Sequence, residues 1–219
     1  MQKVLLIGEE SRIKELVNVL DTSKYEVELS DGDDEEDFKD YDIIFDLNFD
    51  DDSENFPIYA SLKDKLIFLS SVKQSLSEIS YIYPNKVKSR LIGLNCIPSY
   101  LKDKTWEVSL FRGNESVYLE SFFKTIDKQY VLVEDRVGMV RPRCEFLHYN
   151  ELIKTMEENI ILSTTSNEWL LQKLNEIDHI GATTLFETLM ALYEDTKDSR
   201  FVPSNLLKKK YLRNHSFVR

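Results

Sequence analysis

Short apolar runs separated by turn residues predict β-strands in the first part of this 219-residue chain. Residues 3–7 (KVLLI) form the first run and are followed by Gly8. A helical pattern comes next, with apolar residues on one face at Ile13, Leu16, Val17 and Leu20. Residues 26–29 then alternate as a second strand. This order of strand, turn, helix and strand is typical of the βαβ unit of dinucleotide-binding proteins.

Further apolar runs extend the predicted sheet. They lie at residues 42–47, 65–71, 90–94, 106–111 and 130–133. Buried parallel strands have apolar residues on both faces, so these runs predict a mostly parallel sheet.

The pattern changes after residues 134–138, and no strand follows. Val140 begins a predicted helix, whose apolar positions are Val140, Cys144, Leu147 and Ile153. This helix continues over residues 152–161, a break follows at 163–167, and another helix starts at 168–175. We therefore expect a Rossmann-like α/β domain over residues 1–135 and an all-α domain over 136–219.

Composition narrows the class of protein. A formal net charge of −11 argues against binding to nucleic acid, whose phosphates require Lys and Arg. No apolar run reaches the ~18 residues of a membrane span, and a strand begins too early to leave room for a signal peptide, so we expect a soluble cytoplasmic protein. Cys96 and Cys144 lack a partner motif, which predicts two buried thiols and no metal site. The acidic segment 31–54 is interpreted as solvated loops.

The turn after the first strand departs from the Gly-x-Gly-x-x-Gly pattern of dinucleotide sites. Gly8 is present, but Glu10 and Ile13 replace the second and third glycines. Glu10 would place a carboxylate where a pyrophosphate approaches the backbone, and Arg12 could offset only part of that charge. Asp31 stands where an acidic residue would bind the ribose hydroxyls. The pattern predicts the Rossmann fold with weak or absent NAD binding.

Two other segments carry a family signature. The hinge contains Asp135, Gly138, Met139, Arg143, Asn150 and Glu151. The C-terminal part contains His179-Ile180-Gly181, then Ala191-Leu192-Tyr193-Glu194, Asp198-x-Arg200-Phe201 and Pro203-x-x-Leu206-Leu207. Together these segments resemble the 3-hydroxyacyl-CoA dehydrogenases. The resemblance implies NAD as cofactor, an acyl-CoA-type small molecule as substrate, and a Rossmann domain abbreviated after its second strand.

The resemblance also implies where the catalytic groups would stand. The family places a His that takes the hydroxyl proton, and a Glu twelve residues later orients that His. Here these positions are Asn95 and Glu107. An amide has no basic nitrogen, so Asn95 can form a hydrogen bond to a substrate oxygen but cannot act as general base. The family's substrate-binding Ser aligns near Val72, with Ser70 and Ser71 as neighbours, and its Asn after the hinge is Pro142.

Two functions remain open from the sequence. The first is an NAD-dependent 3-hydroxyacyl-CoA dehydrogenase with weak or lost activity. The second is a non-catalytic, dimeric binding or assembly protein that uses the same fold. His148, His179 and His215 supply no clear replacement for the base, and His215 lies in a tail expected to fray. We expect a homodimer, because the apolar faces of residues 140–207, Leu189 and Leu192 included, look too extensive for one small helical domain to bury.

Overall fold

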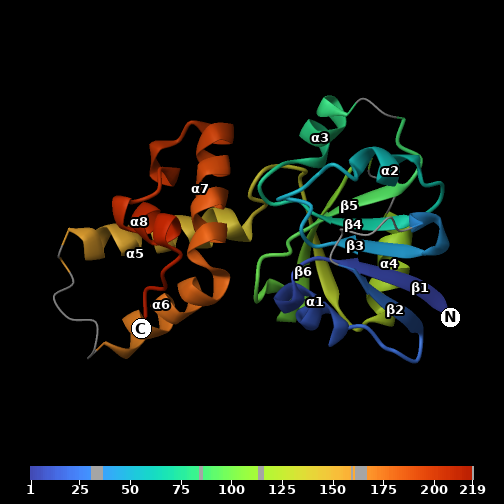
Figure 1. Ribbon diagram of the computed structural model, residues 1–219, viewed down its shortest axis with the longest axis horizontal. Helices are drawn as coiled ribbons and strands as arrows, with labels where there is room; N and C mark the ends of the chain where they lie inside the picture. Colours follow the sequence, from blue (N-terminus) through green and yellow to red (C-terminus); the bar gives the residue numbers. More distant parts are fainter. Residues whose placement is uncertain (31–36, 84–85, 113–115, 159, 161–166, 219) are drawn as a thin grey trace. The chain divides into compact units, whose positions relative to one another are not determined.

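The chain forms two compact units, Met1–Met139 and Val140–Arg219, which are considered separately (Figure 1). The computed structural model describes residues 1–30, 37–83, 86–112, 116–158, 160 and 167–218. Within these residues no helix combines the length and the apolar character needed to cross a membrane.

The first unit contains a seven-stranded sheet in the order β2-β1-β3-β4-β5-β6-β7 (Figure 1). The strands are β1 Gln2–Ile7, β2 Tyr25–Ser30, β3 Ile43–Asp46, β4 Leu66–Ser70, β5 Arg90–Leu94, β6 Thr105–Leu110 and β7 Gln129–Val133. The β5–β6 pair is antiparallel and the other pairs are parallel. The predicted α/β class with a mostly parallel sheet is therefore confirmed.

Helices cover both faces of this sheet. They are α1 Glu10–Val17, α2 Phe56–Ser61, α3 Leu76–Ile82 and α4 Ser116–Thr125, with 3-10 turns η1 Phe38–Asp40 and η2 Tyr100–Lys102. Successive residues of a strand point to opposite faces. Val4 and Leu6 accordingly pack with residues of α1 and α4, whereas Leu5 and Ile7 pack with residues of α2 and α3. The sequence analysis identified α1 but not the short helices α2 and α4.

Asp135, part of the hinge signature, has a structural role within the first unit. Its carboxylate accepts hydrogen bonds from the backbone N–H groups of Leu76, at 2.9 Å, and Ser77, at 2.8 Å. These are among the N–H groups that the first turn of α3 leaves without intrahelical partners. The segment after β7 is further held where the Gly138 N–H donates to the carbonyl of Val72 at 2.6 Å.

The described part of the second unit contains helices and no strand, which confirms the all-α prediction. It contains α5 Arg141–Glu157, α6 Glu168–Ile180, α7 Ala182–Thr196 and α8 Asn205–Arg213, with the 3-10 turn η3 Ser199–Phe201. Helix α5 is shorter than the predicted helix, whose last residues, like the predicted break at 163–167, fall largely outside the described part of the chain.

The predicted inner face of α5 is wrong at its start. Val140 is 54% exposed and Cys144 is also exposed, so only one of the two expected buried thiols, Cys96, is buried. The buried side of α5 instead includes Phe146 and Asn150. Asn150 was not part of the apolar pattern, yet its amide donates to the carbonyls of residues 200 and 202 and accepts from the Ser204 N–H at 2.9 Å. Asn150 is buried because its amide forms the hydrogen bonds that the backbone groups around η3 would otherwise lack.

Two further expectations for this unit concern its assembly and its tail. Leu189 and Leu192 on α7 are fully buried, and α7 packs against α5, α6 and α8. The homodimer stays a prediction. The C-terminal tail is not frayed throughout. The Asp178 carboxylate accepts hydrogen bonds from the N–H groups of Phe217, at 2.6 Å, and Val218, at 2.7 Å.

Candidate functional site

The carboxyl ends of β1, β3, β4 and β5 meet at one edge of the sheet, which is the ligand-binding edge in open α/β folds. The residues that follow these strands are Gly8, Leu47, Ser71 and Asn95. This edge therefore holds Gly8, Ser71 and Asn95, and Glu107 on the neighbouring strand β6 pairs with Asn95. Asp31, the predicted ribose-binding residue, lies outside the described residues.

Asn95 and Glu107 are brought together by the antiparallel pairing of β5 with β6. The Asn95 backbone N–H donates to the Glu107 carbonyl at 3.2 Å, and the side-chain Nδ2 donates to Glu107 Oε2 at 3.0 Å. Asn95 Oδ1 accepts a hydrogen bond from the Ile97 N–H at 3.3 Å. The buried amide is thus oriented from both ends. It can hold an oxygen atom with its second N–H, but it offers no group that takes up a proton.

The glycine turn is packed against the protein's own backbone. Gly8 has φ +148°, and a Cβ at this position would lie 2.9 Å from Leu47 Cβ and 3.2 Å from Asn48 Oδ1. The N–H of Glu9, the next residue, donates to Asn48 Oδ1 at 3.2 Å. Gly8 therefore permits close approach of the segment after β3, and one amide of the turn is already satisfied without a ligand.

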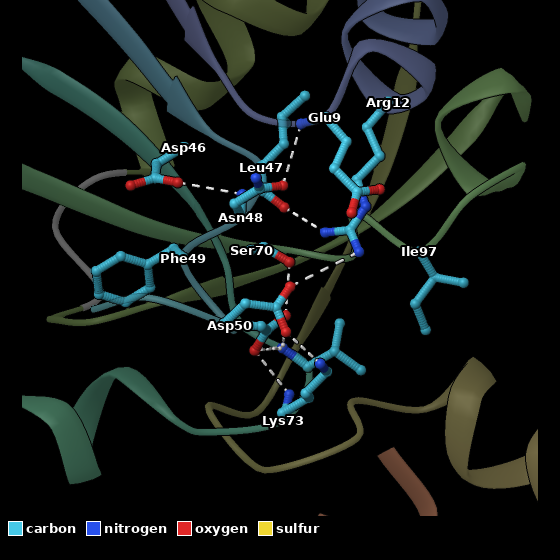
Figure 2. Close-up of polar contacts among 12 residues, drawn as sticks. Glu9, Arg12, Asp46, Leu47, Asn48, Phe49, Asp50, Ser70, Lys73 and Ile97 are labelled. Carbon is cyan, nitrogen blue, oxygen red and sulfur yellow. Dashed lines mark hydrogen bonds and ion pairs between the residues drawn. The ribbon is translucent and has the colours of Figure 1, made fainter. Parts of the chain in front are cut away.

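Arg12, rather than Glu10, fills the space beside this turn (Figure 2). Glu10 is exposed and pairs with Lys14 at 2.6 Å, which lowers the pKa of the Glu10 carboxyl. Arg12 is only 6% exposed, and its Nη1 donates to the Leu47 carbonyl at 2.5 Å. Arg12 Nη2 lies 3.9 Å from Asp51 Oδ2, and its buried Nε has no protein partner among the described residues. The expectation that Glu10 obstructs a pyrophosphate at this turn stays a prediction.

The segment after β3 is not the solvated loop expected for the acidic stretch. The Asp50 carboxylate accepts hydrogen bonds from the Val72 N–H at 2.9 Å, the Lys73 N–H at 2.7 Å and the Ser70 hydroxyl at 2.5 Å (Figure 2). Asp51 forms an ion pair with Lys73. Burial raises the pKa of Asp50, while these donors oppose that shift.

These contacts also occupy the groups expected to bind substrate. The hydroxyl of Ser70 and the N–H of Val72 are bonded to Asp50, as given above, and the Ser71 hydroxyl donates to the Gln74 carbonyl at 2.9 Å. The loop after β4 is thus closed by intramolecular hydrogen bonds. Pro142 lies in the first turn of α5, in the second unit.

Two further buried groups lie at or near this edge. Asp46 is 3% exposed and accepts hydrogen bonds from the Tyr59 hydroxyl at 2.9 Å and the Asn48 N–H at 3.1 Å. Burial raises the pKa of Asp46 to about 7. Burial also raises the pKa of the Cys96 thiol above its usual range, and a thiol that stays protonated is a poor nucleophile.

The residues present do not fit a dinucleotide in the usual position. A pyrophosphate requires close access to the backbone of the glycine turn, whereas here Asn48 binds the turn and the Arg12 side chain lies against Leu47. The sequence indicated that Arg12 lies near the glycine turn, because Arg12 falls on the first turn of the helix after Gly8. The roles of Asp46 and Asp50 were missed. Among the described residues, no group of three or more His, Cys, Asp or Glu could hold a metal ion.

Comparisons with known proteins identify the class of fold. No protein-family model matches the chain, and no curated protein matches it. Solved structures do match. Mycobacterium tuberculosis FadB2 has a TM-score of 0.72 at 16% identity, over 98% of this chain and 94% of that one. The (S)-3-hydroxybutyryl-CoA dehydrogenase PaaH1 from Ralstonia eutropha has a TM-score of 0.69 at 14% identity, over 98% and 94%.

A third match is the 3-hydroxybutyryl-CoA dehydrogenase from Escherichia coli K12. It has a TM-score of 0.67 at 14% identity, over 97% of this chain and 57% of that chain. The resemblance inferred from the sequence is therefore confirmed at the level of the fold, which this chain shares with 3-hydroxyacyl-CoA and 3-hydroxybutyryl-CoA dehydrogenases. At these identities the likeness concerns the fold and not the activity.

Proposed function

We propose that this protein keeps the dehydrogenase fold but binds NAD weakly and has little or no 3-hydroxyacyl-CoA dehydrogenase activity. The observation that carries the proposal is the buried Arg12 side chain, which donates to the Leu47 carbonyl beside the glycine turn. A bound pyrophosphate would have to displace this side chain and break the hydrogen bond from Glu9 to Asn48. Both costs reduce cofactor affinity.

The Asn95–Glu107 pair supports the proposal that dehydrogenase activity is low or absent. Oxidation of a 3-hydroxyacyl thioester requires a group that accepts the hydroxyl proton, and the Asn95 amide does not accept one. Loss of a general base reduces the rate by about 10²- to 10⁴-fold. We expect the hydrogen bond between Asn95 and Glu107 to preserve the geometry of the pair without its proton transfer.

The second candidate is a dimeric binding or assembly protein. Its non-catalytic part is supported by the hydrogen bonds to Asp50, which occupy donors of the loop after β4. In this case we expect a homodimer of about twice the 25.8 kDa chain mass. Light scattering at micromolar concentration tests this, and a mass of one chain would contradict it.

NADH binding tests the proposal most directly. We expect calorimetry on the wild-type protein to give a dissociation constant above about 10 µM, corresponding to a binding free energy weaker than about −7 kcal/mol. The Arg12→Ala variant should bind NADH more tightly than the wild type, because the substitution empties the space beside Gly8. Lys86→Ala, which removes an exposed cation elsewhere in the first unit, is the control and should leave the constant unchanged.

Turnover provides the independent arm of the test. The wild type should reduce acetoacetyl-CoA with NADH at a barely measurable rate. Arg12→Ala combined with Asn95→His should increase that rate, because the second change restores a base beside Glu107. Tight NADH binding together with brisk turnover by the unmodified protein would overturn the proposal.

A further inference from the structure

A second candidate site lies at the opposite edge of the sheet. Five of its lining residues are the first residues of strands β1 to β5: Gln2, Tyr25, Ile43, Leu66 and Arg90. Residues 63–65 and one side of α4 complete a cavity of about 420 Å³. Cavities of about 300–1,000 Å³ hold small organic molecules. The strands between the two edges have four to six residues, which separates this cavity from Asn95 by about 15 Å.

The charge of the cavity differs in sign from that of the chain. Lys63, Lys65 and Arg90 line it against Asp42 and Asp64, a balance of +1 in a chain whose formal charge is −11. Both carboxylates have partners. Asp42 accepts a hydrogen bond from the Lys3 N–H at 3.0 Å, and Asp64 accepts one from Arg90 Nη2 at 3.2 Å.

Lys63 Nζ lies 3.9 Å from Asp64 Oδ2, so Lys65 is the lining cation that these contacts leave available. It is half-buried in the wall of the cavity, and it pairs with no carboxylate in the part of the chain that the structure describes. A partly desolvated ammonium group without a counter-ion favours an anion beside it. The hydroxyl of Ser121, on α4, adds a neutral donor to the same lining.

The rest of the lining is mixed. Gln2 and Thr125 are polar, and the apolar or aromatic residues are Tyr25, Ile43, Leu66, Tyr118 and Phe122. Tyr25 and Phe122 are 3% and 5% exposed and form part of the sheet core beneath the cavity. The Arg90 guanidinium carbon lies 3.7 Å from the centre of the Tyr118 ring. Arg90 is thereby held over an aromatic face by a cation–π contact, and its position is further restrained by Asp64.

We propose that this cavity binds a small organic anion, namely a carboxylate or phosphate group on an apolar or aromatic body. Lys65 pairs with the anionic group, and the apolar lining receives the body. The site is independent of NAD and of the Asn95–Glu107 pair, so its failure or success leaves the proposed function untouched.

Calorimetric titration with phenyl phosphate and with phenylacetate tests the proposal, and the better ligand of the two identifies the anionic group. Benzyl alcohol serves as the uncharged probe and inorganic phosphate as the probe without an apolar body. We expect saturable binding of at least one aromatic anion with a dissociation constant on the order of 1 mM or lower. Both control probes should bind at least about tenfold more weakly.

Variants locate the binding. Lys65→Gln should weaken it about tenfold through loss of the charge-assisted contact, and Ser121→Trp should abolish it by filling the cavity. Lys88→Gln and Val117→Trp are the matched controls, since both residues are exposed and neither lines the cavity. The proposal is overturned if neither anion saturates by about 10 mM, or if Ser121→Trp binds as well as Val117→Trp.

Discussion

Replacement of Asp46 by Asn should make the first unit more stable at neutral and alkaline pH. Asp46 is 3% exposed, and burial raises its pKa from 3.8 to about 7. A carboxyl whose pKa is higher in the folded than in the unfolded chain binds protons more tightly in the folded chain. Its contribution to stability is therefore fully present below about pH 4 and is lost as the pH rises through about 7.

The size of the effect follows from the two pKa values. Each pKa unit corresponds to about 1.36 kcal/mol, so the difference between 3.8 and about 7 amounts to about 4 kcal/mol over the full range. About 2.5 kcal/mol of this is lost between pH 5 and pH 8. Asn fits the same contacts, because its Oδ1 can accept from the Asn48 N–H and its Nδ2 can donate to the Tyr59 oxygen.

Urea unfolding at pH 5 and pH 8 measures this difference. The first unit contains the buried Trp106, and the Trp169→Phe background removes the fluorescence of the second unit. The free energy of unfolding of Asp46→Asn should fall less from pH 5 to pH 8 than that of the parent, by about 2.5 kcal/mol. Glu54→Gln, an exposed change in the same segment, is the control. If both variants follow the parent, the reasoning about Asp46 is refuted.

Two further changes test the packing and the tail. Gly93→Ala should destabilise the first unit by about 2 kcal/mol, because the new Cβ would lie 2.3 Å from Ser109 Oγ and 3.1 Å from Ser71 Cβ. Ser109→Ala in the same chain should recover part of this loss, since the Ser109 hydroxyl has no partner in the described structure, and an equal urea midpoint for the single and double variants would contradict this account. Asp178→Ala should accelerate hydrogen exchange at the amides of residues 217 and 218, and unchanged protection there would show that other contacts hold the tail.

The sequence determined the architecture because its strand signals are local. Apolar runs such as residues 3–7 and 42–47 match the burial of both faces of β1 and β3, and the change of pattern after β7 marks the helical unit. The resemblance to the dehydrogenases pointed to Asn95 and Glu107 as a pair, and they meet because their strands are neighbours in the sheet. Local periodicity was less informative for α2, whose six residues span few turns.

Only the tertiary structure decided which charged residues are inside. Arg12 bonds to a carbonyl 35 positions away, and Asp50 bonds to amides 22 and 23 positions away. A charged side chain is stable in the protein interior only when folding brings hydrogen-bond donors or acceptors to it. These partners are distant in sequence, so no periodic pattern of residues predicts them. The same reason explains the exposure of Cys144 and the burial of Asn150, because the packing of the second unit selects the inner face of α5.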